Sequence, residues 1–230
     1  MRALVYDVHG NLLALRAVLD DARAAGAQEF LLGGDYGLFG PWPTETVATL
    51  RELPDATWIR GNVDRWTARP EEAPDDDLIR AAIDACREAL SERVVAELEA
   101  LPEQFVIDAT RYCHGSPISD VRSFMPTAAD GDDELLGGVA EPRVVFGHTH
   151  LQFSRETQSG VQLVNPGSAG MPFDGDHRAA YGLVSDDGQI ELRRVVYDQE
   201  ASAAAMEERY PGERWAQRSA RRLRTATMCD

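Results

Sequence analysis

The first sixty residues alternate between short apolar runs and longer stretches that carry apolar residues at helical spacing. The runs at 3–6, 30–32 and 57–59 have the length and composition of buried strands. The two stretches between them predict amphipathic helices. This order predicts a βαβαβ unit whose strands are parallel and buried on both faces. The helical faces consist of Leu12, Leu15, Leu19 and Ala22, and of Val47, Leu50 and Leu53.

The remaining chain changes from helical to strand character after Pro102. Residues 68–77 are rich in proline and acidic side chains and predict an exposed loop, and helical stripes follow it up to residue 101. Over the whole chain we expect strands that are parallel early and antiparallel late. The segment from about residue 200 predicts helix, so we expect a domain at 1–198 and an Arg-rich helical extension at 199–230. The later strands are expected at 105–107, 111–113, 144–146, 152–158, 161–164, 181–185 and 190–197.

The composition is that of a globular protein. The chain has 230 residues and a mass of 25.3 kDa, and 43% of its residues are hydrophobic while 27% are charged. No apolar run approaches the roughly 20 residues that span a bilayer. The first residues lack the long apolar core of a signal peptide. We therefore expect a cytoplasmic protein with no membrane partner, and three widely spaced cysteines argue against a disulfide framework.

The charge balance narrows the set of partners. Lys+Arg total 23 against 39 Asp+Glu, a net charge of −16, which argues against a nucleic-acid polymer as ligand. A small phosphorylated substrate stays compatible, because bound metal ions reverse the local field. Six arginines lie between Arg209 and Arg224 against one acid, Glu213. They would suit a phosphate-bearing partner or a second subunit in a homo-oligomer, although a solvated helix face is the simpler interpretation.

Five predicted strands end in residues that commonly bind metals. In an open α/β sheet, ligands bind outside the carboxyl ends of the strands, so these five ends are expected to meet in one crevice. Each short run alone is common, since Gly-Asp is usually a turn and a single histidine is usually a satisfied polar residue. The runs are Asp7-Val8-His9, Gly34-Asp35, Gly61-Asn62, His114-Gly115 and His148-Thr149-His150.

The combined set is chemically specific. It holds two carboxylates, one amide oxygen and four of the five histidines of the chain. Mixed nitrogen and oxygen ligands favour Mn, Fe, Zn or Co over Ca or Mg. Seven ligands are too many for one tetrahedral ion, but they suit two ions that share a carboxylate. We therefore expect a binuclear transition-metal site.

The ordered motifs DVHGN, GGD, GN-x-D, HGSP, GHTH and NPGS resemble those of the calcineurin-like metallophosphoesterase superfamily. The sequence is most similar to the compact prokaryotic phosphodiesterase branch, and the resemblance covers about Met1 to Val196. It implies a four-layer α-β-β-α sandwich of two mixed sheets flanked by helices. It also implies two divalent transition-metal ions, with manganese favoured and Fe, Zn, Co or Ni as alternatives.

The same resemblance implies a role for each candidate ligand. Asp35 would bridge the two ions, and Asp35, Asn62 and His148 are also the expected catalytic residues. The first ion would be held by Asp7, His9 and His150, and the second by Asn62, His114 and His148.

The implied activity is hydrolysis of phosphoric esters or anhydrides by a metal-bridging hydroxide. Many relatives carry a histidine after the Gly-Asn pair that protonates the leaving group, whereas this chain has Val63. Without that acid, a nucleotide-type diester or a phosphoanhydride with a good leaving group is the expected substrate. His177 is either a substitute acid or a solvated loop residue, and Asp64 either orients a neighbouring ligand or caps a turn.

Three alternatives remain at this point. A phosphomonoesterase would use the same site. A non-catalytic scaffold on the same fold, like the retromer subunit, would need no metal, although all seven ligand types are intact here. A nuclease is weakened by the net charge of −16 and by the absence of an evident basic groove.

Overall fold

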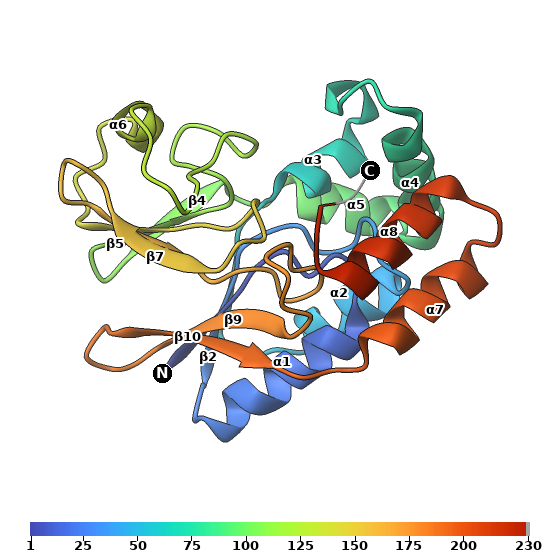
Figure 1. Cartoon of the computed structure of the whole chain (residues 1–230), viewed down its shortest axis with the longest axis horizontal. Helices are drawn as coiled ribbons and strands as arrows, with labels where there is room; N and C mark the ends of the chain where they lie inside the picture. Colours follow the sequence, from blue (N-terminus) through green and yellow to red (C-terminus); the bar gives the residue numbers. More distant parts are fainter. Residues whose placement is uncertain (229–230) are drawn as a thin grey trace.

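The computed structural model describes residues 1–228 and places ten strands of this range in two facing five-stranded sheets (Figure 1). The order of the first sheet is β10-β9-β1-β2-β3, and that of the second is β4-β5-β6-β8-β7. The first contains β1 (Arg2–Val5), β2 (Glu29–Leu32), β3 (Ala56–Trp58), β9 (Ala179–Val184) and β10 (Ile190–Val195). The second contains β4 (Gln104–Ile107), β5 (Thr110–Cys113), β6 (Arg143–Val145), β7 (Phe153–Glu156) and β8 (Gln162–Asn165).

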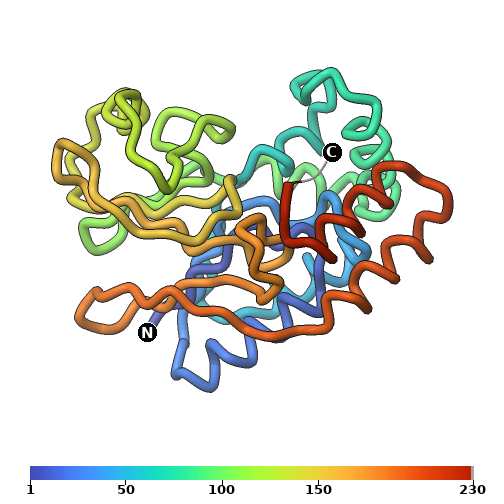
Figure 2. Tube along the Cα trace, viewed as in Figure 1, coloured from blue at the N-terminus to red at the C-terminus, as the bar shows by residue number. Residues whose placement is uncertain are grey.

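The βαβαβ unit predicted for the first sixty residues is confirmed. Strands β1, β2 and β3 are parallel neighbours, connected by α1 (Leu12–Ala24) and α2 (Pro43–Arg51). The Asn11 side chain accepts a hydrogen bond from the Ala14 amide and so caps α1. Figure 2 shows the chain leaving this sheet and returning late, when β9 pairs antiparallel with β1.

The second sheet departs from the expected strand directions. Neighbours β4 and β5, and β7 and β8, are antiparallel as expected for the later strands. The expectation is wrong for β5, β6 and β8, which run parallel. A long crossover that contains α6 (Asp132–Leu136) separates β5 from β6, and parallel neighbours require such a crossover. Three strands of the second sheet therefore point their carboxyl ends in one direction.

Three apolar clusters hold the layers together. The largest lies where helices cover the outer face of the first sheet. The second joins the sheets, with Leu4 and Leu31 on one side and Tyr112 and Val145 on the other. The third covers the outer face of the second sheet, where Phe124 and Leu136 of the 116–142 segment contribute. The result is the predicted four-layer sandwich, with a short outer layer on the second sheet.

Residues 62–99 form a helical layer beside the first sheet (Figure 1). The pattern predicts helices near α4 (Asp77–Ala89) and α5 (Glu92–Glu99), and both are present. It predicts none before residue 77, yet α3 (Asn62–Ala68) and the 3₁₀ turn η1 (Pro70–Glu72) occupy that segment. A seven-residue helix is too short to show a readable apolar stripe. As a consequence, Asn62 is the first residue of a helix.

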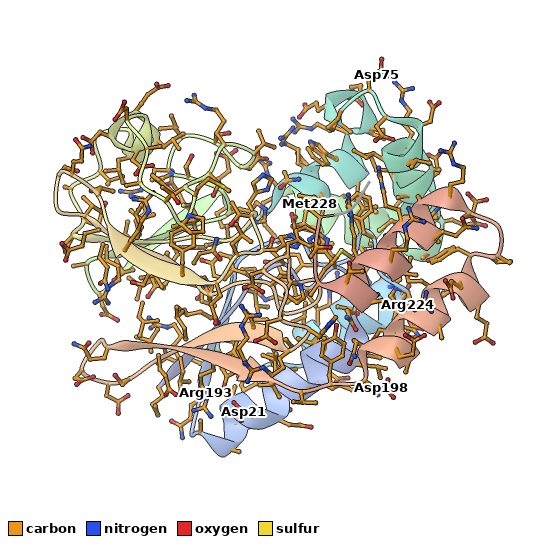
Figure 3. The ribbon with its side chains drawn as sticks, viewed as in Figure 1. Asp21, Asp75, Arg193, Asp198, Arg224 and Met228 are labelled. Carbon is orange, nitrogen blue, oxygen red and sulfur yellow. The ribbon has the colours of Figure 1, made fainter. Side chains whose placement is uncertain are left out.

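The C-terminal segment forms two helices, α7 (Gln199–Arg209) and α8 (Arg214–Thr225). Arg224 of α8, labelled in Figure 3, forms ion pairs with Glu200 and Glu207 of α7. Trp215 of α8 is buried in the same apolar cluster as the first sheet. The domain boundary at residue 198 stays a prediction, and Cys229 lies outside the described residues. In the described range, no helix has both the length and the apolar character needed to cross a membrane.

Candidate metal centre

All seven predicted ligands lie together where the carboxyl ends of the two sheets meet. Asp7 and His9 follow β1, and Asp35 follows β2. Asn62 begins α3 after β3, His114 follows β5, and His148 and His150 follow β6. Because three ends come from the first sheet and two from the second, the site exists only when both sheets are packed together.

One group of four side chains has the geometry of a cation site. One ligand atom from each of Asp7, His9, Asp35 and His150 lies within 4.8 Å of all the others. The Nε2 atoms of His9 and His150 are 3.0 Å apart. His150 Nε2 lies 3.6 Å from Asp7 Oδ1. All four residues are buried, so water cannot solvate the charges that this group would carry.

A second group surrounds the side-chain oxygen of Asn62. Its Oδ1 atom lies 2.9 Å from His114 Nε2 and 2.8 Å from His148 Nδ1. Asp35 lies between the two groups. Its Oδ2 is 3.6 Å from His9 Nε2, while its Oδ1 is 3.4 Å from His114 Nε2. The two carboxylate oxygens of Asp35 therefore face different groups.

Backbone carbonyls set the tautomers of three of these histidines. The Nδ1 atoms of His9, His114 and His150 lie 2.9, 2.8 and 2.5 Å from carbonyl oxygens of Leu38, Gly33 and Met171. A carbonyl can only accept, so each Nδ1 carries a proton and each Nε2, when it is not protonated, presents a lone pair. These lone pairs converge on carboxylate and amide oxygens, and a cation relieves that repulsion. The donor set thus fits divalent transition metals.

The pKa of His114 reports the same crowding of acceptors. Burial lowers it, but the Asp35 and Asp7 carboxylates outweigh burial and raise the pKa to about 10. For Asp35, burial opposes ionisation, yet His114 nearby holds the pKa of that carboxyl well below its usual range. In the protein alone, a proton on His114 compensates the carboxylates. A metal ion at this position would replace that proton.

Backbone conformation marks the site as well. Ten non-glycine residues in the described range have a positive φ, and five of them are candidate ligands. Such conformations are costly and gather where a surrounding structure enforces them. The values are 53° at Asp7, 47° at His9, 62° at Asp35, 67° at His148 and 59° at His150.

Asp64 fixes the loops that carry two of the candidate ligands. Its carboxylate accepts hydrogen bonds from the backbone amides of Asp35, Tyr36 and Gly61, at 2.9, 3.1 and 2.8 Å. Burial, with a contribution from the Asp35 charge, raises the pKa of Asp64 to about 7. The structure bears out both interpretations that the sequence allows. The bond from Gly61 caps the start of α3, and the bonds from Asp35 and Tyr36 orient the loop that carries Asp35.

Two other sequence expectations can now be placed. Val63 is buried in the main apolar cluster, and its amide donates to Asp35 Oδ1 over 3.1 Å. It supplies no acid. His177 is exposed in the loop before β9, as expected of a solvated loop residue.

Sequence reasoning missed an aromatic support behind the centre. The Phe173 ring stacks on His150 with centroids 4.3 Å apart and 13° between the planes. The Arg222 guanidinium of α8 lies 5.7 Å from the centroid of Phe173. The C-terminal helices thus extend to the candidate ligands, and no motif spacing connects residues so far apart in the chain.

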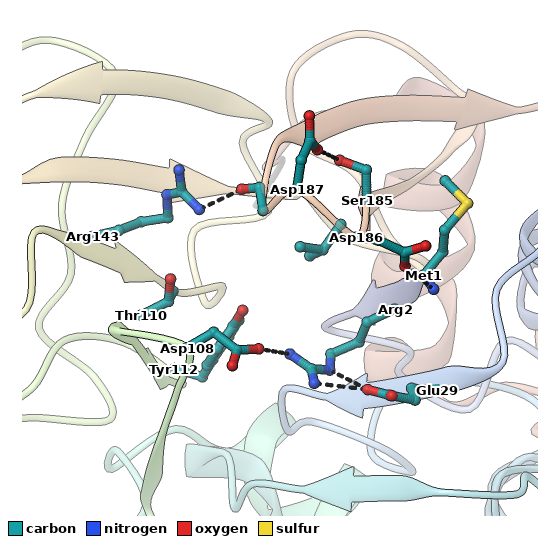
Figure 4. Close-up of a pocket in the computed structure, with 12 residues that line it drawn as sticks. Met1, Arg2, Glu29, Asp108, Thr110, Tyr112, Arg143, Ser185, Asp186 and Asp187 are labelled. Carbon is teal, nitrogen blue, oxygen red and sulfur yellow. Dashed lines mark hydrogen bonds and ion pairs between the residues drawn. The ribbon is translucent and has the colours of Figure 1, made fainter.

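The centre opens at His148, the one candidate ligand that is half-buried while the other six are buried. Cavities of about 340 and 380 Å³ reach His114 and His148. A larger cavity of about 470 Å³ lies at the opposite end of the sheets, near Arg2 and Arg143 (Figure 4). Its charged groups already pair with Glu29 and with the Gly188 carbonyl. We therefore place the functional mouth at His148.

His148 should make the metal-free protein sensitive to acid. Burial and the nearby His114 charge lower its pKa from 6.5 to about 4. Between these values the unfolded chain binds a proton that the folded chain does not, so the stability decreases as the pH is lowered from 6.5 toward 4. Over this range the free energy of unfolding of the wild type should fall, relative to that of His148→Gln, by about 1.4 kcal/mol for each unit by which the pH is lowered. Urea unfolding of both metal-free proteins measures this, and parallel pH profiles would contradict it.

Two facing sheets that bring seven such ligand residues to their common edge define a class of protein, the metallophosphoesterases. The model of the calcineurin-like phosphoesterase superfamily domain matches residues 1–187, and the chain belongs to this family. The resemblance inferred from the sequence motifs is thereby confirmed.

Individual proteins are similar to this chain over most of its length. The crystal structure of a metallophosphoesterase from Sphaerobacter thermophilus is 26% identical, with 98% of each chain covered and a TM-score of 0.81. A hypothetical protein from Pyrococcus horikoshii shares the fold at 20% identity, with 97% of this chain and 98% of that chain covered and a TM-score of 0.79. An uncharacterized protein of Methanocaldococcus jannaschii is 27% identical over 219 residues, which cover 86% of this chain and 88% of its own.

Proposed function

We propose that this protein is a phosphodiesterase that uses two divalent metal ions, preferably Mn²⁺, to hydrolyse a nucleotide-type diester or a phosphoanhydride. The position of Asp35 carries the proposal, because its two oxygens face two separate groups of nitrogen and oxygen ligands. Asp7, His9 and His150 would hold the first ion with Asp35. Asn62, His114 and His148 would hold the second with Asp35.

The side chains of the site would hold the metal ions and orient the substrate. Bound metal ions supply Lewis acidity toward a phosphoryl group and toward water, whose pKa they lower. Asp35 would set the spacing between the two ions. Asn62 and His148 would hold the ion nearest the mouth, so we propose these three as the catalytic residues. The carbonyl partners of the histidines hold the rings against rotation when substrate binds.

The leaving group is the part of the substrate that this site selects. Val63 offers no proton, and its side chain is packed in the core. Loss of a general acid costs roughly 10²–10⁴-fold for a poor leaving group. A phenol or a nucleotide phosphate departs without protonation. This supports a diester or an anhydride over a simple alkyl monoester.

Metal binding should be visible as stabilisation. An ion that binds only the folded chain adds about 2.7 kcal/mol when present at 100 times its Kd. For a chain of this size each kcal/mol raises the Tm by roughly 2–4 °C. We therefore expect Mn²⁺ to raise the Tm of the metal-free protein by about 5–10 °C per site. Calorimetric titration should give two ions per chain, and a stoichiometry of zero or one would contradict the binuclear proposal.

A substrate panel tests the reaction. With Mn²⁺, bis-p-nitrophenyl phosphate and dinucleoside tetraphosphate should be hydrolysed faster than methyl phosphate, and chelator should stop both reactions. Faster hydrolysis of p-nitrophenyl phosphate than of the diester would point to a phosphomonoesterase instead. Two bound ions without turnover of any substrate would favour the scaffold. The cytoplasmic location and a homo-oligomer stay predictions.

A further inference from the structure

The mouth of the centre continues into a cavity with apolar walls. This cavity, of about 380 Å³, is bordered by His148, the most exposed candidate ligand. Its volume lies within the range of roughly 300–1,000 Å³ found for small-molecule sites. Trp66 of α3, Ala73, Pro74 and Val121 line it, together with the ion pair of Arg65 and Glu72. A substrate phosphate held beside His148 would have its ester group next to these walls.

Trp66 presents an aromatic surface that the fold leaves partly unused. Its ring is half-buried and packs against the main apolar cluster on one side. Within residues 1–228 its buried Nε1 atom has no hydrogen-bond partner. Buried donors nearly always have an acceptor, and an exception calls for an explanation. This N–H points along the plane of the indole and is shielded, so a base stacked on the ring face would not accept from it; what the ring offers a planar ligand is the face that borders the cavity.

The loop opposite Trp66 exposes apolar side chains at the same mouth. Val121 lines this cavity and is 43% exposed, and Ile118 lines the neighbouring cavity and is 48% exposed. Large apolar side chains exposed around a cleft mark a binding surface. The apolar character therefore belongs to both sides of the mouth.

Arginine side chains lie on the other flank. Arg65 borders both cavities and is fixed by Asp120, whose oxygens lie 2.7 and 2.9 Å from its nitrogens. Arg60 and Arg69 line the neighbouring cavity that reaches His114. Acidic side chains of the same cavity pair with all three arginines: Glu103 with Arg60, Asp120 and Glu72 with Arg65, and Glu72 with Arg69. The flank beside His114 is therefore polar with compensated charges, whereas the walls beside His148 are mostly apolar. A substrate whose phosphate is held at the ligands would place a flat ring attached to it against Trp66 and the other apolar walls beside His148.

We propose that the cavity bordered by Trp66, Val121 and His148 binds the nucleobase of the substrate, stacked on the indole ring of Trp66. This inference rests on the proposed function, because it names the group attached to the phosphate that the metal centre holds. Stacking on one aromatic side chain contributes about tenfold or more to the affinity for a base. Trp66 is therefore a specificity-determining residue, and it takes no part in the chemical step.

Binding without turnover tests the proposal. Calorimetry should measure adenosine monophosphate, phenyl phosphate and inorganic phosphate against the Mn²⁺-loaded protein. Wild type should bind adenosine monophosphate at least about tenfold tighter than inorganic phosphate. Trp66→Leu should lose this preference while its affinity for inorganic phosphate is unchanged, and Trp66→Phe should keep most of it. Phenyl phosphate binding as tightly as adenosine monophosphate would overturn the assignment to a nucleobase.

A matched control separates the cavity from a general effect of losing tryptophan. Trp58 is also half-buried, but it lies on β3 and packs on Tyr36 with ring centroids 4.9 Å apart. Trp58→Leu should leave the preference for adenosine monophosphate intact. Equal weakening by both variants, or loss of phosphate binding in Trp66→Leu, would overturn the proposal.

Failure of the cavity assignment can be distinguished from failure of the proposed function. If no diester is hydrolysed but adenosine monophosphate binding still depends on Trp66, the cavity assignment stands and the catalytic proposal fails. If diesters are hydrolysed and Trp66→Leu discriminates nucleotide from methyl esters as wild type does, the cavity assignment alone fails.

Discussion

Replacing Asp35 with asparagine is expected to abolish phosphodiester hydrolysis and to weaken both metal ions together. Asp35 directs one carboxylate oxygen toward each ligand group, with Oδ2 toward His9 and Oδ1 toward His114. Metal ions contribute several kcal/mol to phosphoryl transfer. Each 1.4 kcal/mol is about tenfold in rate, so kcat/KM should fall by at least about 10³-fold. Metal content per chain and hydrolysis of an aryl diester measure the two effects.

Asp132→Asn is the matched control for this experiment. Asp132 is also buried, but it lies in α6 and pairs with Arg155 at 2.7 Å. Its substitution removes the ion pair with Arg155 and leaves the centre unchanged, so the folded variant should retain two ions and full kcat/KM. An Asp35→Asn protein that still binds two Mn²⁺ ions would refute the bridging role, whatever its activity.

The strand pattern carried most of the information about where the site lies. Runs of buried residues that end in Asp7, Asp35 and His114 are local features, and parallel strands bring their carboxyl ends to one edge for a general reason. The sequence therefore predicted which residues meet. The direction of the later strands was less accessible, because pairing in the second sheet depends on a crossover of about thirty residues whose only helix is α6.

Other features of the site depend on contacts between residues that lie far apart in the sequence. Asp7 and His148 both have a positive φ and meet across the two sheets, where the His148 amide donates to the Asp7 carboxylate. Asp64 could be recognised as a polar residue near the site, but its three amide partners come from two loops. Phe173 contacts His150 only because the segment after β8 returns to the centre. Tertiary packing, which sequence periodicity does not record, determines all of these contacts.

Gly61→Ala should disable the centre through a single methyl group. A Cβ atom at this position would lie 2.1 Å from Asp35 Oδ1 and 2.5 Å from the Asp35 amide nitrogen. The backbone at Gly61 has φ of −93°, which alanine adopts freely, so collision with Asp35 is the only penalty. Overpacking of this kind costs roughly 1–3 kcal/mol of stability. Displacing Asp35 by about 1 Å should lower kcat/KM by roughly 10²-fold or more.

Gly131→Ala provides the comparison, since Gly131 has φ of −84° and its added Cβ would meet no atom within 4 Å. This variant should match wild type in urea unfolding, Mn²⁺ stoichiometry and hydrolysis. Gly61→Ala should bind Mn²⁺ more weakly and lose activity even where it remains folded, because Asp35 is displaced from both ligand groups at once. Wild-type metal affinity in Gly61→Ala would mean that Asp35 does not hold the ions, and the binuclear proposal would fail with it.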